Sequence, residues 1–173
     1  MQQNKPNATL EELQSFSEIR YQMDFAIRES VMGLEKIALF YMDNTILRGR
    51  FIDTCAKLYG FEKELLNIRG SGSDTASTTK NVARLLKGLN LSQILAVAES
   101  IPPVDDVADV VKELKNRGYV VGIISDSYDV VTNYVKTKIG ADFSLANELE
   151  FSKSVATGEV KLPSFFFNHT DSI

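Results

Sequence analysis

Two short apolar runs, each ending abruptly in polar residues, constrain this chain more than any other feature. Residues 37–40 run into a polar loop at Asp43, and residues 119–124 run into a second polar loop at Ser125. Short apolar runs bounded by turn-forming residues are typical of buried strands. The sequence therefore predicts two buried strands, each delivering polar side chains at its carboxyl end.

Strand and helix patterns alternate around the second run. A helical pattern over residues 107–115 precedes it, another over 130–135 follows it, and a third apolar segment starts at Phe143. This alternation predicts an α/β fold with a parallel sheet. Ligands on such sheets bind outside the carboxyl ends of the strands. We therefore expect the polar loops to lie at one edge, where they form the candidate site.

Residues 1–35 form a separate N-terminal part. A polar start leads to Thr9 and Glu12, a capping-box pattern that predicts the beginning of a helix. Apolar residues then recur at helical spacing, which predicts an amphipathic helix ending near Gly33: Leu10, Leu13, Phe16, Ile19, Met23, Ile27 and Val31. We expect this helix to pack on the rest of the domain, with a link to something upstream as the alternative.

Residues 47–100 carry no convincing strand pattern. Two helical stretches are expected there, 51–59 and 78–86, on either side of a Gly/Ser-rich segment at 70–77, so we interpret the region as a helical insertion. Farther on, residues 148–162 alternate in the manner of a β-hairpin, with its turn expected near Gly158.

Composition and charge exclude several classes of function. Lysine and arginine number 19 against 23 aspartates and glutamates, a net charge of −4, which does not suit binding to a nucleic-acid backbone. No apolar run approaches the roughly 20 residues that span a bilayer, so no membrane partner is expected. The single cysteine, Cys55, has no partner in the chain and no signal-peptide pattern opens it, which favours a cytoplasmic location.

The two strand-and-loop segments together resemble the haloacid dehalogenase-like (HAD) phosphatase superfamily. The loop YMDNT after the first run is similar to its first motif, DxDx(T/V), and GIIS, ending at Ser125, is similar to its second. Residues 112–150 are similar to phosphoserine phosphatases, and TGEV at 157–160 fits the hairpin that follows. The resemblance covers residues 36–162 and implies a Rossmann-type parallel sheet, with residues 47–100 as a small helical cap.

The resemblance also implies roles for particular residues. Asp43 matches the general acid/base and a magnesium ligand, Thr45 the motif threonine, and Ser125 the residue that holds a phosphate oxygen. For Asp126 and Asp129, next along the chain, two interpretations stay open: they tune the phosphate site, or they cap the following helix. The cofactor implied is Mg²⁺.

Tyr41 stands where the family has its nucleophilic aspartate. A phenol with a pKa of about 10 is almost wholly neutral near pH 7 and is a poor ligand for magnesium. We therefore expect the aspartyl-phosphate type of mechanism to be impaired in this chain. The alternative is that the tyrosine ring merely fills the place of the missing carboxylate.

Two basic residues bear on the substrate. Arg50 takes the place of the glutamate that binds the serine ammonium group in phosphoserine phosphatases, and a cation there would favour a carboxylate or a second phosphate. The alternative is an ordinary solvated charge. Lys80 falls near the cap arginine of the family.

By comparison with the family, we expect the sheet to be C-terminally incomplete. The family's lysine and its acidic GDxxxD loop, which completes the magnesium site, are expected beyond residue 162 and are not found. The first strand then lacks a neighbour on one side, and such an unpaired edge favours aggregation. We expect either a longer natural chain or an additional domain or chain that completes the sheet.

These observations lead to two functional hypotheses. The first is a HAD-superfamily phosphomonoester hydrolase, phosphoserine phosphatase-like, acting on a small phosphorylated metabolite but impaired in this chain. The second is a non-catalytic phosphate-binding or structural module of a larger protein. The domain boundaries that we expect are 1–35 for the N-terminal part, 36–46 with 101–173 for the core, and 47–100 for the cap.

Overall fold

The computed structural model describes residues 36–163. The predicted amphipathic helix of the N-terminal part therefore lies outside the described residues. The described chain contains four strands and six helices, in the order β1(Lys36–Tyr41), α2(Phe51–Tyr59), α3(Glu62–Gly70), α4(Thr75–Arg84), α5(Leu91–Ser100), α6(Val107–Asn116), β2(Tyr119–Tyr128), α7(Asp129–Ile139), β3(Phe143–Ser152) and β4(Val155–Lys161).

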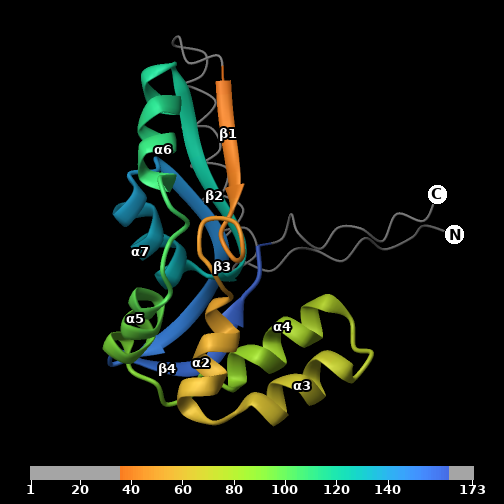
Figure 1. Ribbon diagram of the computed structural model, residues 1–173. Coiled ribbons are helices and arrows are strands. Elements are labelled where there is room, and N and C mark those ends of the chain that lie inside the picture. The colour runs from red at the N-terminus through yellow and green to blue at the C-terminus, as the bar shows by residue number, and fades with distance from the viewer. Residues whose placement is uncertain (1–35, 164–173) are drawn as a thin grey trace, which may run out of the picture.

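The strands form one sheet in the order β1-β2-β3-β4 (Figure 1). β1 and β2 are parallel over their shared length, from Lys36 beside Tyr119 to Tyr41 beside Ile124. β2 and β3 are also parallel, whereas β3 and β4 are antiparallel. The α/β fold with a parallel core and a following hairpin is therefore confirmed. Within the described residues β1 pairs only with β2, so it is an edge of the sheet.

β3 changes partner halfway along its length. Its first half pairs with β2, up to Asn147, and its second half pairs with β4, from Glu148 onward. The turn of this hairpin lies at Lys153 and Ser154, both with positive φ, so the prediction of a turn near Gly158 was wrong. Two consecutive residues with positive φ are typical of the type I′ turns that match strand twist.

Gly158 lies inside β4 and has a different role from the one expected. Its φ is +86°, and a Cβ added there would lie 3.2 Å from the backbone of Arg84, at the end of α4. Glycine thus lets the strand approach the helix closely. The Thr-Gly pair resembles a turn signal in the sequence, but its conformation is set by this packing.

The insertion contains four helices, α2 to α5, rather than the two expected. α4 starts at Thr75, where the Asp74 side chain accepts the backbone N–H of Ser77 at 2.9 Å, so the Gly/Ser-rich connection is shorter than predicted. α5 opens with a capping box between Asn90 and Gln93. This capping signal was present in the sequence and was missed.

The core lies between the sheet and one layer of helices. α6 packs on β2, and α7 packs on both β2 and β3, which places Val121 and Ile123 among fully buried residues (Figure 1). The same cluster continues into the insertion through Phe51 and Ile94, because α5 packs against α7 and α2. The insertion is thereby tied to the sheet at the end where the candidate site lies. In the described part of the chain, no helix is both long and apolar enough to cross a membrane.

Candidate functional site

The carboxyl ends of β1 and β2 lie side by side, as predicted. Tyr41 is in register with Ile124, and the backbone N–H of Met42 donates to the carbonyl of Ile124 at 3.2 Å. The loops that begin at Met42 and at Ser125 therefore start at the same height on neighbouring strands. The candidate site lies where these loops meet the first turn of α2.

Asp43 is held at the amino end of α2. The loop around it forms a tight turn, in which the backbone N–H groups of Ile46 and Leu47 both donate to the Met42 carbonyl at 3.0 Å. The side chain is 8% exposed, and its Oδ1 accepts the backbone N–H of Phe51, the first residue of α2, at 3.1 Å. A carboxyl group at a helix N-terminus meets unpaired N–H groups and a favourable dipole. Asp43 is thus fixed in place before any ligand binds.

Burial dominates the electrostatics of Asp43. Loss of water, with a smaller contribution from the charge of Asp126, raises its pKa from 3.8 to about 6. The hydrogen bond from Phe51 and the charge of Arg50 act in the opposite direction but are outweighed. A carboxyl group with such a pKa exchanges a proton near neutral pH, as a general acid/base must.

The second loop is an irregular segment of β2. The register with β3 shifts between Ile124 and Tyr128, so β2 carries extra residues opposite β3 there, as in a β-bulge. The Ser125 hydroxyl, buried at 1% exposure, accepts the backbone N–H of Ser127 at 3.0 Å. Its own hydrogen remains available to a ligand. The hydroxyl of Ser127 is also buried and has no hydrogen-bond partner among the described residues.

Arg50 and Asp126 pair across the site. A guanidinium nitrogen of Arg50 lies 3.4 Å from Oδ2 of Asp126, and both side chains are partly exposed. Arg50 is the N-cap residue of α2, and the Asp126 carbonyl accepts the side-chain amide of Asn147 at 2.6 Å, so both backbones are fixed. The exposed pair can be opened by a competing anion at little cost.

Tyr41 lies at the end of β1 with 47% of its surface exposed. Partial burial and the negative charges of Asp126 and Asp43 raise its pKa above 10, against the opposing effects of Arg50 and a backbone hydrogen bond at Asp126. The phenol is therefore neutral near pH 7. The charges that act on Tyr41 are thus those of Asp43, Arg50 and Asp126, the other residues of the candidate site.

Other predicted residues lie farther from this group. Thr45 is exposed in the turn after Asp43. Lys80 is exposed on α4, which packs against α3 and β4 rather than against the strand ends. The interpretation of Asp126 and Asp129 as helix caps was wrong: the N-cap of α7 is Tyr128, without a side-chain cap, and Oδ1 of Asp129 accepts the backbone N–H of Leu149 instead.

Sequence analysis missed three residues that shape the site. Asn147 supports the Asp126 carbonyl, the Ser127 hydroxyl is left without a partner, and Tyr128 packs edge-on against Phe51 with ring centroids 6.2 Å apart. Asn147 carried a usable signal, because a buried amide at the carboxyl end of an apolar strand is unusual unless it is hydrogen-bonded. The contact of Tyr128 with Phe51 joins segments far apart in the chain and left no local pattern.

Magnesium, the metal that the resemblance implies, fits the described residues only in part. Asp43 and Asp126 are two carboxylates at one edge, but one accepts a helix N–H and the other pairs with Arg50. Among residues 36–163 no group of three potential ligands is close enough to hold a metal ion. Magnesium prefers six oxygen ligands, so these residues alone do not complete a site.

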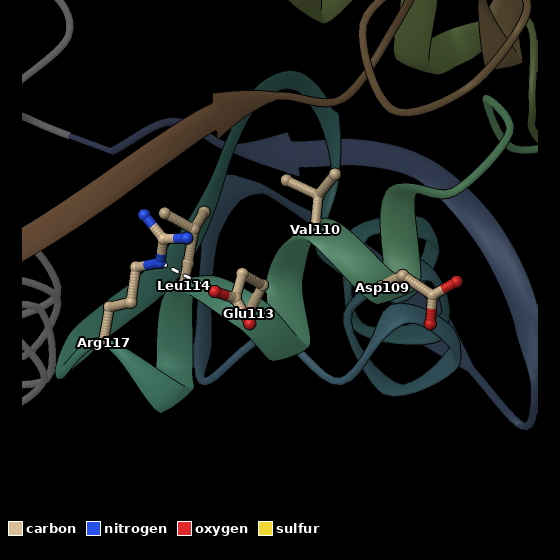
Figure 2. Close-up of a pocket in the computed structure, with 5 residues that line it drawn as sticks. All are labelled: Asp109, Val110, Glu113, Leu114 and Arg117. Atoms are coloured by element: carbon tan, nitrogen blue, oxygen red, sulfur yellow. Dashed lines mark hydrogen bonds and ion pairs between the residues drawn. The ribbon is translucent and has the colours of Figure 1, made fainter.

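A hollow on the outer surface of α6 is unrelated to the strand ends. Four of the lining side chains come from α6 and the fifth, Arg117, directly follows it: Asp109, Val110, Glu113, Leu114 and Arg117. Figure 2 shows that Glu113 and Arg117 pair with each other. A surface built from one helix gives no convergent set of polar groups around a ligand. The site at the strand ends therefore remains the candidate.

Comparisons with known proteins agree with this geometry. The family model of haloacid dehalogenase-like hydrolases matches residues 38–171. A phosphoserine phosphatase of Methanocaldococcus jannaschii is 34% identical over 132 residues, covering 73% of this chain and 62% of the relative. One from Wolinella succinogenes is 30% identical over 129 residues, covering 72% and 63% respectively.

Solved structures give the same result. A phosphoserine phosphatase described as a phospho-aspartyl intermediate analogue superposes with a TM-score of 0.64 at 32% identity, covering 73% of this chain and 62% of the other. The chain thus spans a little under two thirds of the length of these relatives, and only 32% of another phosphoserine phosphatase that it matches. Because the family match extends over most of its length and includes both loops of the site, this chain belongs to the haloacid dehalogenase-like hydrolase family, and within it resembles the phosphoserine phosphatases.

Proposed function

We propose that this chain derives from a phosphomonoester hydrolase for a small phosphorylated metabolite, with its phosphate site at the carboxyl ends of β1 and β2. The observation that carries the proposal is Asp43, a buried carboxyl group whose pKa is raised to about 6. It lies beside the loop after β2 that begins at Ser125, which is the candidate for binding phosphate. Such a group can protonate a leaving oxygen and then accept a proton from water near neutral pH.

The loop after β2 supports the same proposal. Because the Ser125 hydroxyl already accepts the Ser127 N–H, it is oriented to donate its own hydrogen to a phosphate oxygen. The unpartnered Ser127 hydroxyl is a second potential donor. Magnesium, when bound in the family, would neutralise charge on the transferring phosphoryl group.

Tyr41 leads us to propose that turnover is impaired. In the aspartyl-phosphate type of mechanism, a carboxylate oxygen attacks phosphorus, the leaving alkoxide takes a proton, and water then hydrolyses the acyl phosphate. Asp43 can serve both proton transfers, but Tyr41 offers a neutral phenol in place of the attacking carboxylate. The first step therefore lacks its nucleophile.

A specific observation favours a second candidate, a non-catalytic module that binds a phosphorylated ligand. Asp126 places a negative charge in the loop that begins at Ser125, and its Oδ2 lies 3.4 Å from a guanidinium nitrogen of Arg50. A ligand with two anionic groups, such as a phosphate and a carboxylate, would compete for Arg50 and open the pair. On this proposal Arg50 selects the ligand.

The test is phosphate release from a panel of phosphomonoesters by the chain and by its Tyr41→Asp variant, with magnesium present and absent. We expect the chain to be silent. Magnesium-dependent turnover by Tyr41→Asp, abolished by a further Asp43→Asn change, would show that Tyr41 is what impairs the site. Magnesium-dependent turnover by the unaltered chain, lost in Asp43→Asn, would refute the proposed impairment. If both proteins are silent but nuclear magnetic resonance shows that inorganic phosphate perturbs Ser125 and Ser127, the second candidate is supported.

We also propose that a further strand completes the sheet at the edge of β1, from a second chain or from outside the described residues. The support is the unpaired edge of β1 within the described fold. A free edge predicts rapid hydrogen exchange at alternate amides of β1, and slow exchange at all of them would indicate a bound strand. The buried free thiol of Cys55 is compatible with the cytoplasmic location that we propose.

A further inference from the structure

One face of the sheet edge is apolar and lies outside the core formed with the described helices. Alternate residues of β1 point to this side, with Ile37 45% and Leu39 55% exposed. Ala38 and Phe40 point to the opposite side, where they pack against the core. β1 is therefore apolar on both faces, although the described helices cover only one.

The same face continues across β2 and β3. The strand register places Leu39 beside Gly122 and Gly122 beside Phe143, whose ring lies so close that a Cβ on Gly122 would be 2.3 Å from it. Ser144 points the other way, because its hydroxyl bonds to Asn133 on α7 at 3.1 Å. The resulting surface, named here the open face, consists of Ile37, Leu39, Gly122, Ile124, Phe143 and Leu145. The register places Val120 and, at the end next to the candidate site, Tyr41 on the same side. None of the six belongs to the hydrophobic cluster formed with the described helices or packs against it.

We propose that the amphipathic segment over residues 10–31 docks its apolar stripe on the open face. The stripe recurs at helical spacing and matches an apolar surface in chemistry: Leu10, Leu13, Phe16, Ile19, Met23, Ile27 and Val31. On a helical wheel the opposite side carries Glu11, Glu18, Gln22 and Glu29, which would face water, together with one apolar residue, Phe25. Arg20 falls within the stripe, where its long side chain would have to extend past the sheet edge to reach water. The occupant of the open face is thus a segment of the same chain.

Chain length and connection favour this occupant over a second copy. A helix over residues 10–31 would be about 33 Å long, enough to cover the six residues of β1, about 20 Å. Only residues 32–35 separate the segment from the strand. A tether this short gives an effective concentration of the order of millimolar, which a second copy does not reach in dilute solution.

The comparisons set this segment apart from the shared fold. The family match begins at residue 38, after the segment and at the start of β1. The proposed contact therefore involves a segment that the family model does not cover, and it does not rest on the proposed function. It covers the face of β1 and leaves its hydrogen-bonding edge available to a further strand.

The full chain contains no tryptophan, so Leu39→Trp provides a single fluorescent reporter on the open face. We expect its emission to be blue-shifted and poorly quenched by acrylamide at every protein concentration. Adding Phe16→Glu and Met23→Glu on the stripe should shift the emission to the red. The matched control adds Gln14→Glu and Gln22→Glu, two equal charges on the opposite side, and should leave it unchanged.

Three outcomes would overturn the proposal: a solvent-exposed reporter in the parent, a blue shift that disappears on dilution, or the same response to both pairs of charges. The dilution outcome would identify a second copy as the occupant. A second measurement covers the case in which the stripe variant does not fold. Nitroxide labels on cysteines introduced singly at Ser17 and Asp24 should quench the reporter from at least one position, and no quenching from either would refute the contact. Cys55 is fully buried and does not compete for the label.

Discussion

Replacing Asp43 by asparagine tests whether burial of this carboxyl group destabilises the folded protein near neutral pH. Asparagine keeps an oxygen that can accept the Phe51 N–H, so the contact at the start of α2 is retained. The pKa of Asp43 rises from 3.8 to about 6 on folding, which corresponds to about 3 kcal/mol.

The sign follows from which state holds the proton. Between the two pKa values the folded state keeps the proton on Asp43 and the unfolded state has lost it, so the free energy of unfolding falls as the pH rises. Below about pH 4 both states are protonated and the cost is absent; above about pH 6 it is complete. Asp43→Asn should therefore be about as stable as the parent at about pH 4 and up to about 3 kcal/mol more stable at about pH 8.

Urea unfolding of both proteins across this pH range measures the difference directly. Asp109→Asn, which removes a negative charge from an exposed position on α6, is the matched control and should show no comparable trend. In Asp126→Asn the fall in stability should move to lower pH, because Asp126 contributes to the raised pKa of Asp43. Stability curves for Asp43→Asn and the parent that run parallel from acid to alkaline pH would refute the reasoning.

Three further substitutions test the packing. Gly122→Ala should cost about 1–3 kcal/mol in urea unfolding, because its Cβ would meet the Phe143 ring at 2.3 Å, whereas Gly70→Ala, with nothing within 4 Å, should be neutral or slightly stabilising; equal effects would contradict the close approach. Asn90→Ala removes the side-chain half of a capping box and should cost about 1 kcal/mol, with loss of helicity by circular dichroism. Phe51→Ala leaves a cavity in the core and should lower stability by about 3–5 kcal/mol; a change under about 1 kcal/mol would show that its ring is not packed as described.

The sequence alone was enough to predict the parallel part of the fold and the place of the site. Apolar runs at 37–40 and 119–124 form strands because their burial dominates, and chain direction then brings the loops at Asp43 and Ser125 to one edge. Their spacing also carried the family resemblance. These are local patterns whose consequences depend little on the rest of the chain.

Tertiary structure decided the features that depend on contacts between distant segments. The hairpin turn lies at Lys153 and Ser154, whereas Gly158 lies inside β4, where the strand passes close to α4. The ion pair of Arg50 with Asp126 joins residues 76 positions apart, and no periodicity in the sequence reports it. The raised pKa of Asp43 likewise comes from burial by the whole fold. Local patterns determine which side chains reach the strand ends, whereas solvent exclusion and long-range pairing determine what those side chains can do chemically.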